Sequence, residues 1–170
     1  ERFKSGPTRS ARDEALVAIH GWILMGNHFH LLVSERIENG TSKFLTKLNV
    51  GYAKYFNDRY ARSGTLFQGR TKKILIDSDA HFLHILHYIH LNALDFSTGS
   101  NEWRTGAIRD HLDAVRKLES YRWSSFLDYC GEPNFPSILT KELFQGMYPD
   151  YRATITKYLK NIEEPIPDLE

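Results

Sequence analysis

Two histidines separated by one residue, His28 and His30, are placed to hold a metal ion. In an extended strand, residues i and i+2 project from the same face, so both imidazoles would lie together while Phe29 turns to the opposite face. Two neutral imidazoles side by side can bind one divalent cation. Histidine pairs at this spacing also arise by chance, so the pattern alone leaves a purely structural role open.

A tyrosine and an asparagine, Tyr88 and Asn92, are four residues apart in an apolar segment. If this segment is helical, positions i and i+4 lie on one face, so the phenol and the amide point the same way. A tyrosine hydroxyl can be the nucleophile in covalent catalysis, and an amide oxygen is a suitable ligand for a hard cation. The pair is a candidate catalytic site, and a core tyrosine followed by a helix-ending asparagine is the structural alternative.

The histidine pair falls in a predicted β-hairpin. Residues 16–25 are rich in apolar and β-branched side chains, Gly26-Asn27 is a turn signal, and residues 28–34 continue as a second strand. Because the turn is short, we expect the two strands to be antiparallel neighbours.

A helix is predicted after the hairpin, with Thr41 or Ser42 as its N-cap. Apolar and aromatic residues recur every four positions in this helix and include Tyr52 and Phe56. Such a face normally packs against the rest of the protein, so we expect these two rings in the core.

Residues 65–76 are predicted to be extended. Asp77 or Ser78 then caps a helix from residue 79 to about residue 94, and a shorter helix is expected near residues 108–118. Strands and helices that alternate in a short chain indicate an α+β sandwich, in which helices pack on one face of an antiparallel sheet.

Basic residues are concentrated in one stretch of the chain. Residues 41–76 contain eight Lys or Arg and one acid, Asp58, a net charge of +7, whereas the whole chain carries +1. Tyrosines and phenylalanines are interleaved with these cations. This combination indicates a nucleic-acid-binding surface, and an ordinary solvated basic face is the alternative.

Length and composition favour one globular domain. The chain has 170 residues, of which 41% are hydrophobic, and domains average roughly 150 residues. No apolar run approaches the ~20 residues that a membrane span needs. The one cysteine, Cys130, cannot form an internal disulfide, so we expect a cytoplasmic protein without a membrane partner.

Four segments occur in the order NHFHLLV, NVGYAKYFNDRYARSGTLFQGR, YIHLN and YRWSSF between Ile19 and Tyr129. In sequence and order they resemble the HUH single-tyrosine transposases, and most closely the REP-associated tyrosine transposases, which are related to bacterial insertion-sequence transposases. The resemblance implies a bacterial protein with a ferredoxin-like α+β sandwich and the HUH motif on a central strand. It also implies a catalytic domain over residues 1–130 and a C-terminal extension over residues 131–170.

The same resemblance implies a site and a reaction. His28, His30 and Asn92 would be the ligands of Mg²⁺ or Mn²⁺, and Tyr88 would be the nucleophile. Family members cut single-stranded DNA beside a hairpin, form a 5′-phosphotyrosine, release a 3′-OH and can rejoin the ends. The partner would be single-stranded DNA with hairpin, REP-like ends, and the protein would act as a monomer or homodimer.

Five basic residues flank the SGTLFQGR signature and are the predicted DNA contacts: Arg59, Arg62, Arg70, Lys72 and Lys73. Two other functions stay open: a domesticated DNA-binding module that has lost catalysis, and a rolling-circle replication initiator or relaxase. His84, four residues before Tyr88, could act as a base or contact DNA, although we expect a simple surface position.

The chain departs from the family pattern at three places. Family members usually begin with a strand of the pattern HV-T-RG, and none is visible before Arg12. They commonly have Pro before the residue that Asn27 matches, where this chain has Gly26, and Pro-Val-Arg after the asparagine that Asn92 matches, where this chain has Ala93-Leu94-Asp95. The missing strand concerns the completeness of the sheet, and the missing arginine removes one potential DNA contact.

Overall fold

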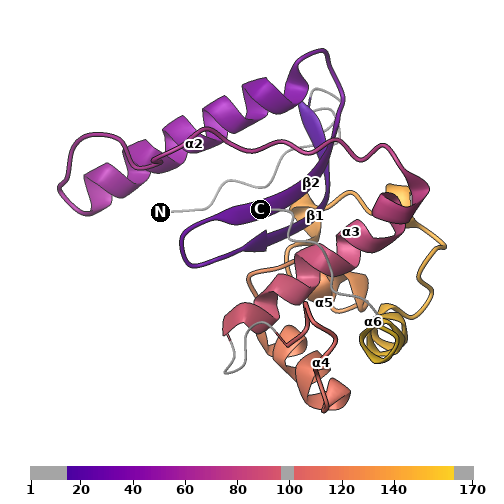
Figure 1. The fold of residues 1–170 in the computed structure, drawn as a ribbon. Helices are drawn as coiled ribbons and strands as arrows, with labels where there is room; N and C mark the ends of the chain where they lie inside the picture. The colour runs from indigo at the N-terminus through magenta and orange to yellow at the C-terminus, as the bar shows by residue number, and fades with distance from the viewer. Residues whose placement is uncertain (1–14, 97–101, 163–170) are drawn as a thin grey trace. The chain divides into compact units, whose positions relative to one another are not determined.

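The computed structural model describes residues 15–96 and 102–162, and the chain has an α+β fold (Figure 1). Strand β1 (Val17–Leu24) and strand β2 (Phe29–Glu35) form the predicted hairpin. The segment before Arg12, where the first strand of the family would lie, is outside the described residues. None of the helices in the described ranges has the length and apolar character needed to cross a membrane.

The chain forms two compact units that do not follow its order. The first unit comprises the described residues up to Ala18 together with Val33–Ile74, and the second comprises Ile19–Leu32 together with the described residues from Leu75 onward. The α-helices of the two units are α2 (Gly40–Arg59) in the first, and α3 (Asp79–Leu91), α4 (His111–Ser120), α5 (Phe126–Tyr129) and α6 (Tyr151–Lys160) in the second.

Helix α2 begins earlier than the sequence predicts. Its N-cap is Asn39, which has a left-handed backbone with φ of 57°, so the expected cap at Thr41 or Ser42 is wrong. A Cβ at Gly40 would lie 2.2 Å from the carbonyl oxygen of Leu16. The close approach of the chain at Gly40 therefore requires glycine and fixes where the helix starts.

The expectation that α2 buries an aromatic face is wrong. Its one buried residue is Gly40, whereas Tyr52 is 49% exposed and Phe56 is half-buried. Residues 65–76, predicted to be extended, contain no strand. The segment contacts α2 through Phe67, whose ring centroid is 6.2 Å from that of Tyr52, and through Lys73, but the described residues of this unit form no further strand that would pair with the segment.

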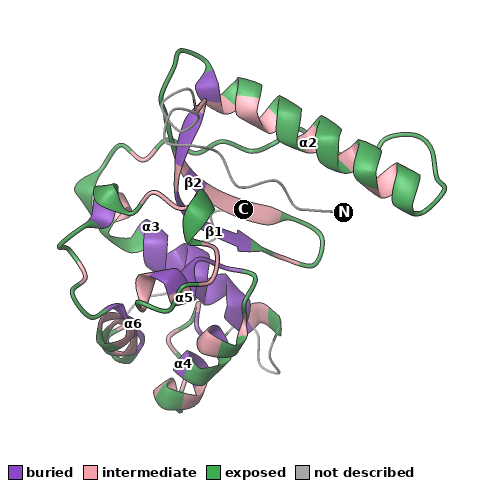
Figure 2. Cartoon of the chain, turned by 180° about the vertical axis from the view of Figure 1, so that it is seen from behind, coloured by how far each residue is buried: buried purple, intermediate pink, exposed green. Residues whose placement is uncertain are grey.

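Helix α3 is the centre of the second unit. All seven residues from Ile85 to Leu91 are buried (Figure 2), and seven consecutive residues cover every side of a helix with 3.6 residues per turn. Strand β1 approaches α3 closely, because a Cβ at Gly21 would lie 2.9 Å from Cδ1 of Leu86. Of the two residues predicted as the cap of α3, Asp77 and Ser78, the structure has Ser78, whose side chain accepts a hydrogen bond from the His81 N–H.

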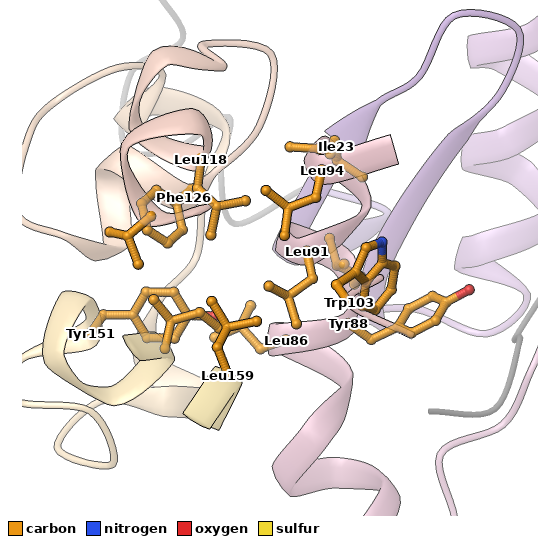
Figure 3. Close-up of a cluster of buried hydrophobic side chains, with 14 of the residues drawn as sticks. Ile23, Leu86, Tyr88, Leu91, Leu94, Trp103, Leu118, Phe126, Tyr151 and Leu159 are labelled. Carbon is orange, nitrogen blue, oxygen red and sulfur yellow. The ribbon is translucent and has the colours of Figure 1, made fainter. Parts of the chain in front are cut away.

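One hydrophobic core joins α3 to α4, α5 and α6 (Figure 3). Helix α6 contributes Tyr151, Ile155 and Leu159, which recur every four residues and form one apolar stripe. Leu118 of α4 and Phe126 of α5 lie in the same cluster. Residues beyond 130 therefore share a core with the helix that carries Tyr88, and the domain boundary near residue 130 stays a prediction.

The YRWSSF segment lies along the free edge of β1. The Leu24 N–H donates to the Trp123 carbonyl at 2.9 Å, and the Ser125 N–H donates to the Trp22 carbonyl at 3.0 Å. In the described residues β1 thus lies between β2 and this segment, while β2 has β1 as its neighbour. The ferredoxin-like arrangement with the histidines on a central strand stays a prediction.

Candidate functional site

The two histidines of the hairpin lie side by side, as the period of a strand predicts. His28 immediately precedes β2 and His30 is its second residue, and their Nε2 atoms are 3.2 Å apart. Two nitrogens that bind one ion at ~2.1 Å, with an angle of roughly 90–110° between them, lie about 3.0–3.4 Å apart. The observed spacing therefore fits two adjacent ligands of one cation.

A neighbouring amide orients the His28 ring. Nδ1 of His28 is 2.7 Å from Oδ1 of Asn27, and an amide oxygen accepts hydrogen bonds, so Nδ1 is the protonated nitrogen. In a neutral imidazole the other nitrogen, Nε2, then presents a lone pair, and it faces His30. A hydrogen bond from the outer nitrogen is how proteins commonly fix a metal-binding histidine.

Tyr88 lies beside this pair in the same compact unit. Its ring meets the His30 ring edge-on with the centroids 6.0 Å apart, and it packs against Trp103 at 5.7 Å. Figure 3 shows its hydroxyl oxygen directed away from the other labelled core side chains. The residue is only 2% exposed, so the surrounding side chains cover most of the phenol.

Asn92 lies close to Tyr88 but is engaged by another residue. Its side chain is completely buried, and its Nδ2 donates to the Tyr88 carbonyl at 2.9 Å. Its Oδ1 accepts a hydrogen bond from Nη2 of Arg104 at 2.8 Å. The i,i+4 spacing thus brings Tyr88 and Asn92 together as predicted, and a guanidinium holds the oxygen that was predicted to bind a metal.

Arg104 is a site residue that the sequence analysis missed. Its Nη1 is 2.6 Å from Oδ1 of Asp95, and its guanidinium stacks 4.1 Å from the centre of the Trp103 ring. Burial by itself lowers the pKa of Arg104, but hydrogen bonds and charge interactions with Asp95 and Tyr88 raise it above its ordinary value. Arg104 therefore carries a permanent positive charge beside the tyrosine.

A second polar cluster is buried on other sides of α3. Nδ1 of His87 and Nδ1 of His90 are 3.1 Å and 2.8 Å from the Tyr151 hydroxyl, and Nε2 of His90 is 2.7 Å from Oγ of Ser125. Burial, with a smaller contribution from His84, lowers the pKa of His87 to about 4. Burial, with a smaller contribution from His87, lowers that of His90 to about 3. His84 itself is exposed, as expected.

The five predicted DNA-contacting residues are all exposed and belong to the first unit: Arg59, Arg62, Arg70, Lys72 and Lys73. Three of them have internal contacts, and the first is Arg59, which lies 6.0 Å from the centre of the Tyr60 ring. Arg62 lies 5.7 Å from the centre of the Phe56 ring, and Nζ of Lys73 donates to Oγ of Ser42 at 2.7 Å. Basic side chains at the surface are available to phosphates, which is what the prediction requires.

Comparisons with known proteins add no relative. No family model matches the sequence, and neither the curated proteins nor the solved structures include a match.

Proposed function

We propose that this chain is a metal-dependent transposase that cleaves and rejoins single-stranded DNA at hairpin-flanked sites through a 5′-phosphotyrosine. In this proposal it has the ferredoxin-like fold of the HUH single-tyrosine enzymes, with the HUH motif on a central strand. The observation that carries the proposal is the placement of His28, His30 and Tyr88 as neighbours in one compact unit, with the two Nε2 atoms 3.2 Å apart.

His28 and His30 would hold Mg²⁺ or Mn²⁺, together with Asn92. An amide oxygen has two lone pairs, so Oδ1 of Asn92 can accept from Arg104 with one and bind an ion with the other. No cluster of three His, Cys, Asp or Glu side chains suited to a metal occurs in residues 15–96 and 102–162, so the amide or water completes the ligand set. When bound, the cation supplies positive charge that polarises the scissile phosphate.

Tyr88 performs the covalent step. Its oxygen attacks the scissile phosphorus, a bond from this oxygen to phosphorus forms, and the bond from phosphorus to the 3′ oxygen breaks. The hydroxyl proton leaves the tyrosine, and the departing 3′ oxygen ends as a hydroxyl. Because one phosphodiester replaces another, the tyrosine keeps the DNA end activated for rejoining by the reverse step.

The direct test of this function is a search for the covalent intermediate. The protein is incubated with a single-stranded oligonucleotide that forms a hairpin, with Mn²⁺, and the products are separated under denaturing conditions. A protein band shifted by the mass of the downstream fragment, whose 5′ phosphate is joined to the tyrosine, and sensitive to nuclease, supports the proposal. Failure to form an adduct with any oligonucleotide of a randomised hairpin library would reject it.

The alternative with an observation in its favour is a DNA-binding module that has lost catalysis. Tyr88 is covered in this structure, as a purely structural core tyrosine would be. The two functions give different results in the same assay, because a binding module retains the hairpin oligonucleotide without forming an adduct.

Metal binding is expected to depend on the histidine pair. Calorimetric titration with Mn²⁺ should show one site in the wild-type protein, and His28→Ala or His30→Ala should abolish it, because each removes one of two adjacent imidazoles. His84→Ala is the matched control, since His84 is an exposed histidine of the same unit. Equal Mn²⁺ affinity in wild type and His28→Ala would contradict the assignment.

DNA binding is expected to depend steeply on salt. Each lost phosphate contact reduces the slope of log affinity against log salt by about 0.7 for single strands. Arg70→Ala and Lys72→Ala should each lower the affinity for unrelated single-stranded sequences to a similar extent. Lys160→Ala, an exposed lysine at the end of α6, is the control and should leave the slope unchanged. Binding that is insensitive to salt would contradict the placement of the DNA surface in residues 41–76.

A further inference from the structure

Arg104 connects the side chains at the end of α3 into one hydrogen-bonded group. One end of its guanidinium pairs with Asp95 at 2.6 Å, and the other donates to Oδ1 of Asn92 at 2.8 Å. Tyr88 packs against the same Trp103 ring that Arg104 contacts, with the ring centroids 5.7 Å apart, and its interaction with the guanidinium contributes to the raised pKa of Arg104. Arg104 is therefore the residue through which Tyr88, Asn92 and Asp95 are joined.

The position of this guanidinium is strongly restrained. The centre of the Trp103 ring lies 4.1 Å from the guanidinium carbon, and the same indole donates its N–H to Oδ1 of Asp95 at 2.7 Å, so Oδ1 of Asp95 accepts from both residues. The Arg104 side chain is only 16% exposed. A planar donor with several N–H groups can serve three partners in such a fixed arrangement, which a lysine ammonium on a flexible chain does less well.

We propose that Arg104 is a further catalytic residue, which donates to the Tyr88 oxygen as the bond between this oxygen and phosphorus forms and breaks. The inference rests on the proposed function and names a group for the same site. In the forward step the hydrogen bond orients the oxygen toward the phosphorus while the hydroxyl proton leaves. In the reverse step a 3′ hydroxyl attacks phosphorus, its proton leaves, and the Tyr88 oxygen departs as a phenolate beside the guanidinium charge.

The physical basis is that a fixed positive donor stabilises charge where it develops. The negative charge on the Tyr88 oxygen grows as its bond to phosphorus breaks, and a preorganised donor in a water-poor site stabilises that state more than the starting state. Arg104 already contacts the residue before the reaction, so no reorganisation is needed. Nη2 of Arg104 donates to Oδ1 of Asn92, the C-cap of α3, and so holds the Asn92 amide one turn from Tyr88.

The test is single-turnover adduct formation with a hairpin oligonucleotide and Mn²⁺. Arg104→Gln is expected to lower the maximal rate by ~100-fold, as loss of a preorganised donor does, with the half-saturating DNA concentration changed less than about twofold. Arg104→Ala should regain part of the lost rate when guanidinium ion is added. Arg116→Gln, an exposed arginine of α4 paired with Asp113, is the matched control and should keep the wild-type rate without responding to guanidinium.

The outcomes separate this inference from the function on which it rests. If the wild-type protein forms no adduct, the proposed function fails. If the wild type is active and Arg104→Gln keeps its rate, the role of Arg104 is wrong. The role of Arg104 is also wrong if added guanidinium ion does not accelerate a slow Arg104→Ala variant. It is equally wrong if the lower rate of Arg104→Gln is explained by a higher half-saturating DNA concentration. Should Arg104→Gln unfold, Arg104→Lys replaces it in the test. One ammonium cannot hold Asp95 and Asn92 and donate to Tyr88 in the same fixed geometry, so a lower rate is expected and a wild-type rate would overturn the role of the guanidinium.

Discussion

Tyr88→Phe is expected to abolish the covalent protein–DNA adduct while leaving the fold and DNA binding in place. The substitution removes one oxygen and keeps the ring that packs between His30 and Trp103. The loss of a hydrogen bond with Arg104 should cost only about 1 kcal/mol of folding free energy. The measurement combines the denaturing-gel adduct assay with a DNA-binding isotherm and a thermal melt.

Exposed tyrosines of the first unit provide the control for this result. Tyr52, Tyr55 and Tyr60 are all exposed on or beside α2, and are therefore more accessible than Tyr88. None of the three has a histidine pair among its ring contacts, and Tyr55→Phe is expected to form the adduct at the wild-type rate. An adduct that persists in Tyr88→Phe and disappears in Tyr55→Phe would transfer the nucleophile to α2 and refute the site proposed above.

The parts of the site that the sequence predicts are those that depend on local periodicity. The strand period of two places His28 and His30 on one face, and their Nε2 atoms lie 3.2 Å apart. The helix period places Asn92 one turn after Tyr88, and the amide donates to the Tyr88 carbonyl. Ser78 caps α3 because a serine side chain satisfies an N–H that the helix leaves unpaired.

Arg104 could not be predicted in this way. It lies twelve residues beyond Asn92, and its position depends on Trp103 and Asp95 rather than on any repeat in the sequence. The cluster around Tyr151 is a second case, since Tyr151 is 64 residues from His87 and 61 from His90. The histidines of α3 lie on several faces of the helix, and the sequence does not indicate which of these faces is buried. Only tertiary packing determines that.

The errors in the first unit have a related cause. A four-residue aromatic repeat indicates which face of α2 is apolar, but not whether another element covers it. Tyr52 remains 49% exposed because what it meets from the facing segment is the Phe67 ring, with the centroids 6.2 Å apart, and that segment forms no strand. In the same way residues 65–76 have the composition of a strand, yet a strand needs a hydrogen-bonded neighbour, and the structure gives this segment none among the described strands.

Acid is expected to destabilise the second unit through its two buried histidines. Because the fold lowers the pKa of His87 to about 4 and that of His90 to about 3, both stay neutral in the folded chain at a pH where they take up protons in the unfolded chain. Their contribution to stability is fully present above about pH 6.5 and is lost as the pH falls below it. When the pH is lowered from about 7 to about 5, each histidine should lower the free energy of unfolding by about 2 kcal/mol.

Urea unfolding at a series of pH values measures this effect, and His87→Gln tests its origin. The variant should be less stable than wild type near neutral pH, because the Tyr151 hydroxyl loses a partner in the core. Its stability should nevertheless fall less steeply with acid, because one of the two titrating groups is gone. His111→Gln, at the start of α4 and outside the cluster, should retain the wild-type slope. In wild type, His87 takes up a proton below about pH 6.5 only when the chain unfolds, and this difference contributes to the slope. A wild-type slope in His87→Gln would therefore mean that other groups cause the acid sensitivity.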